Sequence, residues 1–384
     1  MTVLEYTIRF ATPAFLGNAE QEAQWRTPPF KALIRQWWRI AKAKDFGYDH
    51  KKMLAEEKCL FGTASESNQT SERAKGLGRS KMQLRLEHWD RGTLTTDGVP
   101  QGKRIRHEEV KKKDGSVIEI GANLYLGYGA VGMRTAIAPA NEVARLRIMV
   151  PSESGHDIHR TIQLANWFGT MGSRSRNGWG SIIIKDEMRQ TGIKGLADIN
   201  TGSITTTLLP RPLEECLKLD WPHALGSDDK GVPLVWRLLK VRTNDNGQKE
   251  LVSFSSWEEV IHELARIKIA IRTHFKFKGG GKNQGHMVPQ SRHLLAYPAG
   301  ANHSVMQKGW GKDGRLANQL RFKVHPRGEG FAGLIFHLPC GLPRHMRDSV
   351  RNFVPNEGDV WREVHRLLNE EHRNGLVRIK GASQ

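Results

Sequence analysis

The chain has 384 residues, 38% of them hydrophobic and 11 of them tryptophan, a composition that can bury more than one core and favours two domains. Lys and Arg number 59 against 40 acidic residues, and the net charge of +19 favours a polyanionic partner, above all a nucleic acid. No apolar run approaches the roughly 20 residues of a membrane helix. No signal peptide opens the chain, so we expect a cytoplasmic protein without a membrane partner.

The three cysteines are far apart in the sequence and odd in number. They are Cys59, Cys216 and Cys340. This usage fits a reducing cytoplasm and excludes both a disulfide framework and a cysteine zinc site. No metal and no other cofactor is expected.

The first half reads as alternating strands and helices. Strands are expected at residues 2–10, 81–89, 143–150 and 181–185. Helices are expected at about 27–44 and 157–168, the first capped by Thr27 with Pro28 and Pro29 in its first turn. The order is therefore βαββαβ.

The second half repeats this order. Strands are expected at 232–241, 318–325, 331–338 and 376–379, and helices at 257–273 and about 359–372. Ser256 with Glu259 predicts a capping box for the first of these helices. The predicted fold class is α+β, with two tandem ferredoxin-like (βαββαβ, RRM-type) domains that carry basic insertions. We place the domains at 1–191 and 231–384, with a linker at 192–230.

Two insertions rich in Lys and Arg interrupt the pattern, at about 91–142 and 275–297. The first holds Lys103, Arg104, Arg106, Lys111, Lys112 and Lys113; the second holds Lys276, Lys278, Lys282 and Arg292. Such insertions are either solvated loops or functional segments. On a duplicated nucleic-acid-type fold they favour contact with a nucleic-acid strand.

Residues 169–181 form a loop with four glycines and two arginines between a predicted helix and a predicted strand. Glycines let a backbone approach another polymer closely, and such turns point N–H groups at phosphate oxygens. Arginines add charge and a planar face for bases. The alternative is a long solvated turn. The predicted contact residues are Gly172, Arg174, Ser175, Arg176, Gly178 and Gly180.

The first predicted helix has an apolar face and a basic stripe. The apolar face includes Trp37 and Trp38, which we expect in the core rather than as base-stacking platforms. The stripe consists of Lys31, Arg35, Arg39 and Lys42. It is either a solvated face or a rail for phosphates. Because it lies off the tryptophan face, reversing the charge of its arginines is expected to leave the fold intact.

Several segments of the first half resemble a known family. They read TPAFLG at 12–17, RTPPFK at 26–31, RQWWR at 35–39, LFG at 60–62 and LYLGYG at 124–129, followed by the glycine-rich loop. Together they resemble the N-terminal signature of the RAMP superfamily. Within it, they are most similar to the first-named Cmr subunit of type III-B CRISPR effector complexes.

The resemblance implies a non-catalytic RNA-binding subunit at the end of a ribonucleoprotein filament, acting in antiviral defence. Its partners would be the 3′ portion of the CRISPR guide RNA, the paired target RNA and other RAMP and Cmr-type subunits. By resemblance, the RNA contacts would include Lys31, Arg35, Arg39, Arg174 and Arg176. The basic residues Lys103, Arg104, Arg106, Lys278 and Lys282 join them as predicted contacts.

Other readings compete with this one. Residues 127–132 match G-x-G-x-x-G, but Pro139 breaks the helix that a dinucleotide site would need. His156 and His159 have no partner pattern for a metal and are interpreted as surface histidines. A metal-independent guide-RNA endoribonuclease remains an alternative, with His156, His107 or His286 as general base and Arg174 or Lys282 as the stabilising cation. A structural scaffold is the third.

Overall fold

The structure is a computed structural model, and it describes residues 1–63, 78–111, 114–139, 141–187, 210–279, 285–300, 303–311, 314–350 and 355–380. The chain forms two compact units. The first consists of residues 1–99, 129–175 and 179–208, and the second of 100–128, 176–178 and 209–384. The first half of the sequence is therefore divided between the two units. Each is described by itself.

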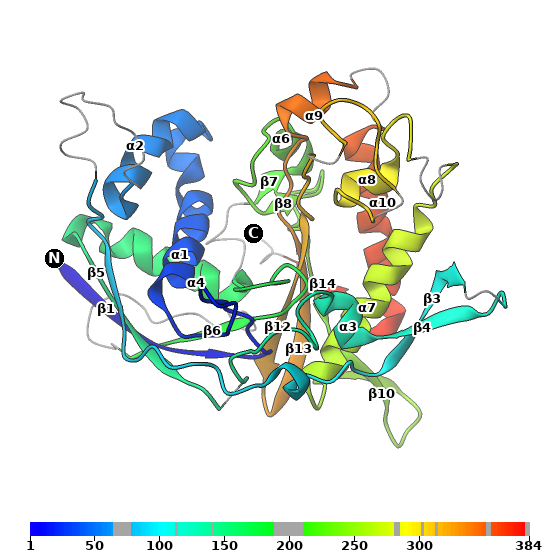
Figure 1. Cartoon of the computed structure of the whole chain (residues 1–384), viewed down its shortest axis with the longest axis horizontal. Helices are drawn as coiled ribbons and strands as arrows, with labels where there is room; N and C mark the ends of the chain where they lie inside the picture. Colours follow the sequence, from blue (N-terminus) through cyan, green and yellow to red (C-terminus); the bar gives the residue numbers. More distant parts are fainter. Residues whose placement is uncertain are drawn as a thin grey trace. The chain divides into compact units, whose positions relative to one another are not determined.

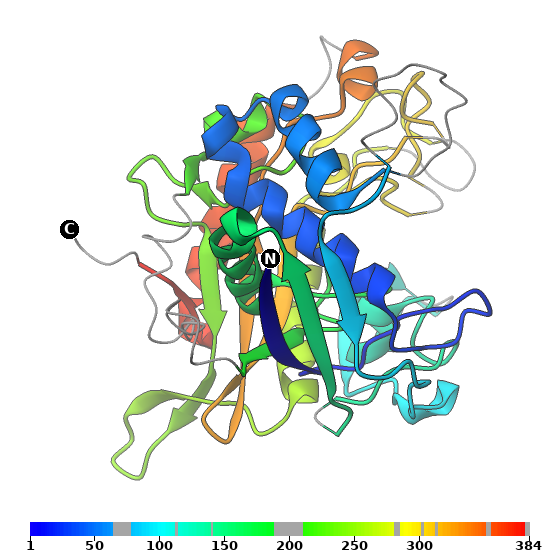
Figure 2. The same ribbon diagram turned by 90° about the vertical axis from the view of Figure 1, so that its left-hand side faces the viewer.

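The first unit is built on an antiparallel four-stranded sheet in the order β2-β5-β1-β6. The strands are β1 (Thr2–Phe10), β2 (Gln83–Leu86), β5 (Ala144–Val150) and β6 (Ile182–Asp186). The helices are α1 (Thr27–Lys42), α2 (His50–Phe61) and α4 (Gly155–Phe168), with the 3₁₀ turns η1 (Ala43–Phe46), η3 (Thr96–Gly98) and η4 (Ser152–Ser154). α1 and α4 pack together behind the strands (Figure 2).

The second unit has its own antiparallel sheet, in the order β12-β13-β9-β14. The strands are β9 (Val235–Leu238), β12 (Leu320–Arg327), β13 (Gly330–His337) and β14 (Leu376–Arg378). The longer helices are α7 (Trp257–His274) and α10 (Glu357–Glu370), followed by η5 (Glu371–Asn374). The two sheets have the same topology. If the four strands of each sheet are numbered in chain order, they lie side by side in the order 2-3-1-4, and a helix follows the first and the third strand.

Smaller elements complete the second unit. They are β3 (Arg104–Lys111), β4 (Val117–Gly121), α3 (Ala122–Gly127), β7 (Arg211–Pro212), α6 (Leu213–Leu217), β8 (Gly226–Ser227), β10 (Lys240–Thr243), β11 (Lys249–Val252), α8 (Ser291–Leu295) and α9 (Arg344–Asp348). β3 and β4 form a hairpin that extends beyond α7, while α3 and β3 pack on α7 (Figure 1). Part of the first predicted insertion thus belongs to the second unit.

Two local expectations fared differently. The capping box of α7 is confirmed in its first half, because the Ser256 hydroxyl accepts a hydrogen bond from the Glu259 amide at 3.4 Å. The Glu259 carboxylate accepts instead from the Ser255 hydroxyl at 2.9 Å and from Lys240 at 3.2 Å. The cap of α1 is wrong. Thr27 is the first helical residue, and the preceding Arg26 makes no side-chain capping bond. Pro28 and Pro29 do lie in the first turn.

The expected strand 232–241 is divided into β9 and β10, because β10 turns away to pair with β11.

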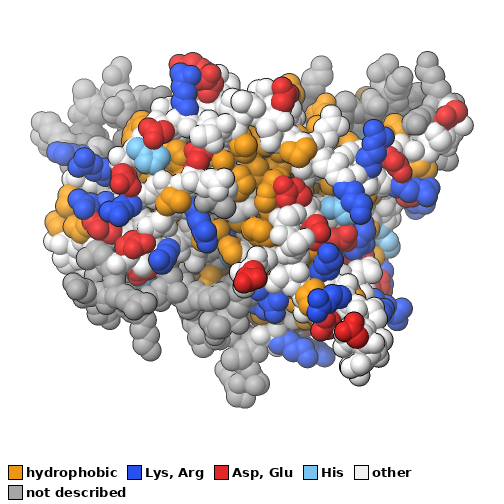
Figure 3. All heavy atoms as spheres, turned by 90° about the horizontal axis from the view of Figure 1, so that it is seen from below, with side chains coloured by type: hydrophobic (Ala, Val, Ile, Leu, Met, Phe, Trp, Pro, Cys, Tyr) orange, Lys and Arg blue, Asp and Glu red, His pale blue; other side chains and the backbone are white. Residues whose placement is uncertain are grey.

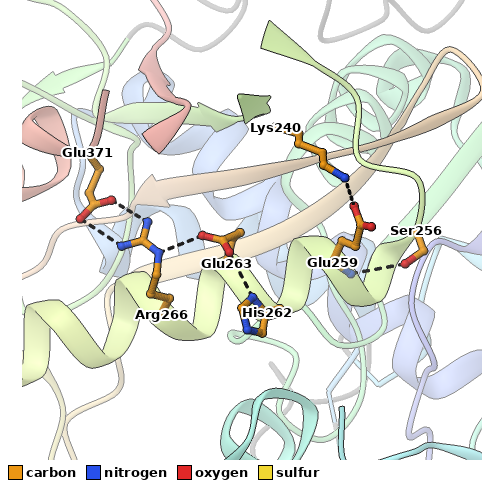
Figure 4. A network of polar contacts seen from close by, with 7 residues as sticks. All are labelled: Lys240, Ser256, Glu259, His262, Glu263, Arg266 and Glu371. Atoms are coloured by element: carbon orange, nitrogen blue, oxygen red, sulfur yellow. Dashed lines mark hydrogen bonds and ion pairs between the residues drawn. The ribbon is translucent and has the colours of Figure 1, made fainter. Parts of the chain in front are cut away.

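The polar side of α7 is held by a network of ion pairs (Figure 4). Arg266 donates to Glu263 at 2.8 Å and to Glu371 of η5 at 2.6 Å. Hydrogen bonding from His262, together with Arg266, lowers the pKa of Glu263 to about 2 despite its burial. Both carboxylates are therefore charged at neutral pH and tie α7 to the end of α10.

Trp37 and Trp38 are core residues, as expected, each with 1% of its surface exposed. Trp38 packs edge-on against Phe61 of α2, with ring centroids 5.6 Å apart. Trp38→Ala should lower the free energy of unfolding by roughly 3–5 kcal/mol, because a large aromatic leaves a cavity that neighbours fill only in part. Urea denaturation followed by circular dichroism measures this. A loss below about 1 kcal/mol, typical of surface substitutions, would contradict the packing.

Candidate nucleic-acid interface

The glycine-rich loop is braced against its own unit rather than free. The Met171 amide donates to the Gly180 carbonyl at 2.9 Å, which closes the loop at its base. The Gly180 amide donates to the Pro13 carbonyl at 2.9 Å, and the Ser173 amide to the Phe15 carbonyl at 3.0 Å. These bonds hold the backbone of the loop along the TPAFLG segment. The alternative of a long solvated turn does not describe this arrangement.

The glycines of the loop are required by the protein's own packing. Gly172 and Gly180 have φ of +88° and +60°, in the left-handed region that favours glycine. A Cβ at Gly180 would lie 1.9 Å from the Met171 carbonyl oxygen, and one at Gly172 would lie 2.6 Å from that of Phe15. Gly180 is buried, whereas Gly172 is exposed. Of these two predicted contacts, only Gly172 presents its backbone to solvent.

Arg174 is exposed at the turn of the loop and has an unusual backbone. Its φ of +60° is uncommon for a residue with a side chain, at a cost of roughly 1–3 kcal/mol that surrounding structure must offset. It makes no ion pair with any described residue. Beside it, Arg134 donates to the Ser173 hydroxyl at 2.9 Å. Sequence reasoning missed Arg134, which follows the G-x-G-x-x-G match by two residues.

Residues 176–178 of the same loop belong to the second unit. Asn177 forms a parallel bridge with Phe322 of β12, and the Phe322 amide donates to the Arg176 carbonyl at 3.0 Å. The Asn177 side chain accepts from Lys268 of α7 at 2.6 Å and donates to the Leu126 carbonyl at 2.8 Å. The segment is thus fixed along the outer edge of β12. Arg176 is exposed there, and Gly178, with φ of +92°, is buried.

The basic stripe of α1 is anchored on one buried carboxylate. Arg35 and Arg39 both donate to Glu57 of α2, with Arg39 Nε at 2.8 Å from one carboxylate oxygen and its Nη2 at 2.5 Å from the other. The Glu57 side chain is fully buried, while the arginines keep 33% and 37% exposure. Burial alone would raise the pKa of Glu57, but the hydrogen bonds from Arg39 and Arg35 outweigh it and lower that pKa.

The two lysines of the stripe are less available to bind a phosphate than the sequence suggests. Lys42 forms ion pairs with Asp45 at 2.7 Å and Asp157 at 2.8 Å. Lys31 is half-buried, and burial together with the charge of Arg35 lowers its pKa. The expectation that reversing the charge of Arg35 and Arg39 leaves the fold intact did not take their pairing with Glu57 into account, and this pairing favours the opposite result.

The basic insertions present exposed cations in the second unit. Lys103, Arg104 and Arg106 are exposed at the start of the β3–β4 hairpin, and Lys278 is exposed after α7. Arg106 approaches Glu108 at 3.4 Å. Lys112, Lys113 and Lys282 lie outside the described residues. On the face drawn in Figure 3, Lys and Arg side chains are interspersed with Asp and Glu rather than gathered in one patch.

The candidate general bases differ in their surroundings. His286 is 4% exposed, and its ring nitrogens contact Gln290 and His303, each at 3.0 Å. His156 is exposed, but His159 is buried against the Tyr6 hydroxyl at 3.2 Å, so its interpretation as a surface histidine is wrong. Among the described residues, no group of three or more His, Cys, Asp or Glu side chains is placed to hold a metal ion.

Comparison with known proteins gives structural likenesses only. No family model matches the chain, and no curated protein matches it. Its fold is similar to that of Cmr1 from Pyrococcus furiosus in the apo form, with 16% identity over 99% of both chains and a TM-score of 0.44. It is also similar to a chain of the type III-B Cmr-beta complex bound to cognate target RNA and AMPPnP in the presence of ssDNA. There the identity is 11%, over 96% of this chain and 98% of that one, with a TM-score of 0.45.

A second Cmr-beta structure, bound to cognate target RNA, gives 11% identity over 88% of this chain and 94% of that one, with a TM-score of 0.42. This chain itself has a mixed α and β architecture with several antiparallel sheets. None of the helices in the described part of the chain combines the length and the apolar character needed to span a membrane.

Proposed function

We propose that this chain is a non-catalytic RNA-binding subunit of a type III-B CRISPR ribonucleoprotein effector complex. It contacts the 3′ portion of the guide RNA and the paired target RNA, and it acts in the cytoplasm beside other RAMP and Cmr-type subunits. The motif resemblance at 12–17, 26–31, 35–39 and 60–62 supports this assignment. The observation that carries it is the braced loop, which holds Arg174 and Arg176 exposed and without a carboxylate partner among the described residues.

Both units are proposed to be ferredoxin-like domains. The support is the shared strand order of the two sheets and the helix that follows the first and the third strand of each. A rigid sheet carries the loop at the start of β6, so the arginines begin from a fixed backbone. Such pre-organisation lowers the ordering cost of binding a flexible RNA strand.

Two exposed arginines suit a phosphate backbone, because a guanidinium donates bidentate, charge-assisted hydrogen bonds to phosphate oxygens. The endoribonuclease alternative predicts cleavage products when the pure protein is incubated with labelled repeat RNA in EDTA. A mobility shift without products favours binding alone.

Arg174→Ala with Arg176→Ala should weaken binding of a fluorescein-labelled oligouridylate by about a hundredfold or more, since each charge-assisted bond contributes roughly 1.5–3 kcal/mol. Fluorescence anisotropy measures the dissociation constant. The wild-type affinity should also fall with salt, with a log–log slope of about −0.7 for each phosphate contacted on a single strand.

The melting temperature should stay the same or rise slightly in this double variant, because exposed arginines add little to stability. Arg366→Ala is the matched control. It removes an exposed arginine of α10 that pairs with Glu363 at 2.7 Å, and its RNA affinity should equal that of the wild type. Equal affinity in the double variant and in the control would remove the support for the proposal.

A further inference from the structure

Arg321 lies on β12 beside the loop segment 176–178. Leu320, Phe322 and Val324 of this strand are buried apolar residues, and Arg321 alternates with them on the other face of the sheet. Arg321 is half-buried, and its Nε atom is buried with no hydrogen-bond partner. A buried donor without a partner costs about 1–3 kcal/mol, so it calls for an explanation.

Arg176 is held next to it by the backbone. The Arg176 carbonyl accepts from the amide of Phe322, the residue that follows Arg321, at 3.0 Å. The parallel bridge between Asn177 and Phe322 places Arg176 and Arg321 side by side. Burial, and then the charge of Arg176, lowers the pKa of Arg321 to about 9. Two like charges are thus kept together at the edge of the sheet.

Within the described part of the chain, no carboxylate forms an ion pair with either of these two arginines. Cys340 also acts on both arginines. Burial raises the pKa of its thiol to about 11, so the thiol is uncharged at neutral pH. Glu357 and Asp220 act on Cys340, and Glu357 is engaged by Arg347 at 3.7 Å and by the Leu342 amide at 3.0 Å. The positive charge of the pair therefore has no ion-paired carboxylate among the described residues.

We infer that Arg321 and Arg176 form a two-arginine clamp for one phosphate group of the RNA backbone. The inference rests on the proposed function and extends it to a residue of the second sheet. A phosphate between the two groups would accept hydrogen bonds from the outer nitrogens of both guanidinium forks. Its negative charge would offset the repulsion that the empty clamp carries.

The test uses the full chain with Arg321→Met, which keeps an unbranched apolar stem and removes the charged guanidinium group. RNA affinity measured by anisotropy should fall about tenfold or more, the effect of one lost charge-assisted contact. The melting temperature without RNA should stay the same or rise, because the substitution relieves repulsion between like charges. Added inorganic phosphate should stabilise the wild type more than the variant. Arg321→Lys should recover only part of the affinity, because it restores the charge without the fork.

Arg378→Met is the matched control. Arg378 lies on β14 of the same sheet and pairs with Asp228 at 2.9 Å, so its loss should lower the melting temperature and leave RNA affinity unchanged. A wild-type affinity in Arg321→Met overturns the clamp, and so does a loss of stability as large as that of the control. If the Arg174 and Arg176 double variant still loses affinity, the proposed function stands without the clamp. If the wild type binds no RNA, the proposed function fails. In that case the clamp is judged by inorganic phosphate alone: if phosphate raises the melting temperature of the wild type and of Arg321→Met equally, the clamp is overturned as well.

Discussion

Reversing the charge of both Arg35 and Arg39 to glutamate should unfold the first unit. Glu57 would lose both of its partners and face two further carboxylates while its side chain remains fully buried. Leaving one buried charge without a partner costs about 3–5 kcal/mol. That is a large fraction of the roughly 5–15 kcal/mol that stabilises a typical domain. Far-UV circular dichroism across a urea titration would measure the loss.

The matched control removes all three charges at once, with Arg35→Met, Arg39→Met and Glu57→Met. Replacing a buried ionic group by apolar residues of similar volume is often neutral or stabilising, so this variant should fold. It also tests the phosphate rail on a folded protein, because its RNA affinity reports what the α1 arginines contribute. If the double charge reversal has the same urea midpoint of unfolding as the wild type, Glu57 does not depend on these arginines.

Gly180→Ala should be the most destabilising single substitution in the loop. Gly180 has φ of +60°, and a Cβ built on it would lie 1.9 Å from the Met171 carbonyl oxygen and 3.0 Å from the carbonyl carbon. Both atoms belong to the backbone, which is bonded here to the Gly180 carbonyl and cannot yield without breaking that contact. We expect a loss of stability of several kcal/mol, well above the roughly 1–2 kcal/mol of a left-handed alanine alone.

Gly132→Ala is its control. Gly132 also has a positive φ, of +74°, but nothing lies within 4 Å of a Cβ built there. The control measures the conformational cost alone, roughly 1–2 kcal/mol, and the difference between the two melting temperatures isolates the steric clash. Equal melting temperatures would mean that the loop backbone moves freely, and its bracing against Pro13 and Phe15 would then be refuted.

Much of the local structure could be predicted from the sequence. The apolar spacing of α1 placed Trp37 and Trp38 in the core, and Ser256 marked the start of α7. These features depend on residues close together in the chain. The division of the strand at 232–241 was missed, because its end depends on pairing with β11 rather than on its own pattern.

The site was harder to predict, because its partners come from distant segments. Nothing in the spacing of Arg35 and Arg39 shows that Glu57, on the next helix, lies between them. Nothing near the loop points to Arg321, which is brought beside Arg176 only by the bridge from Asn177 to Phe322. The sequence pointed to the arginines of the loop but not to the residues around them. Those neighbours decide whether an arginine is neutralised by a carboxylate or can bind a phosphate.

The assignment of the loop to both units also limits how this protein can be divided. A fragment that ends near residue 191 would keep Asn177 but lose Phe322 and Lys268, to which that residue is bonded. The complementary fragment would lack residues 100–128 as well, including β3, which packs on α7. No single cut in the chain yields both units whole. Dissection of this protein therefore calls for substitutions in the intact chain rather than for separate expression of its halves.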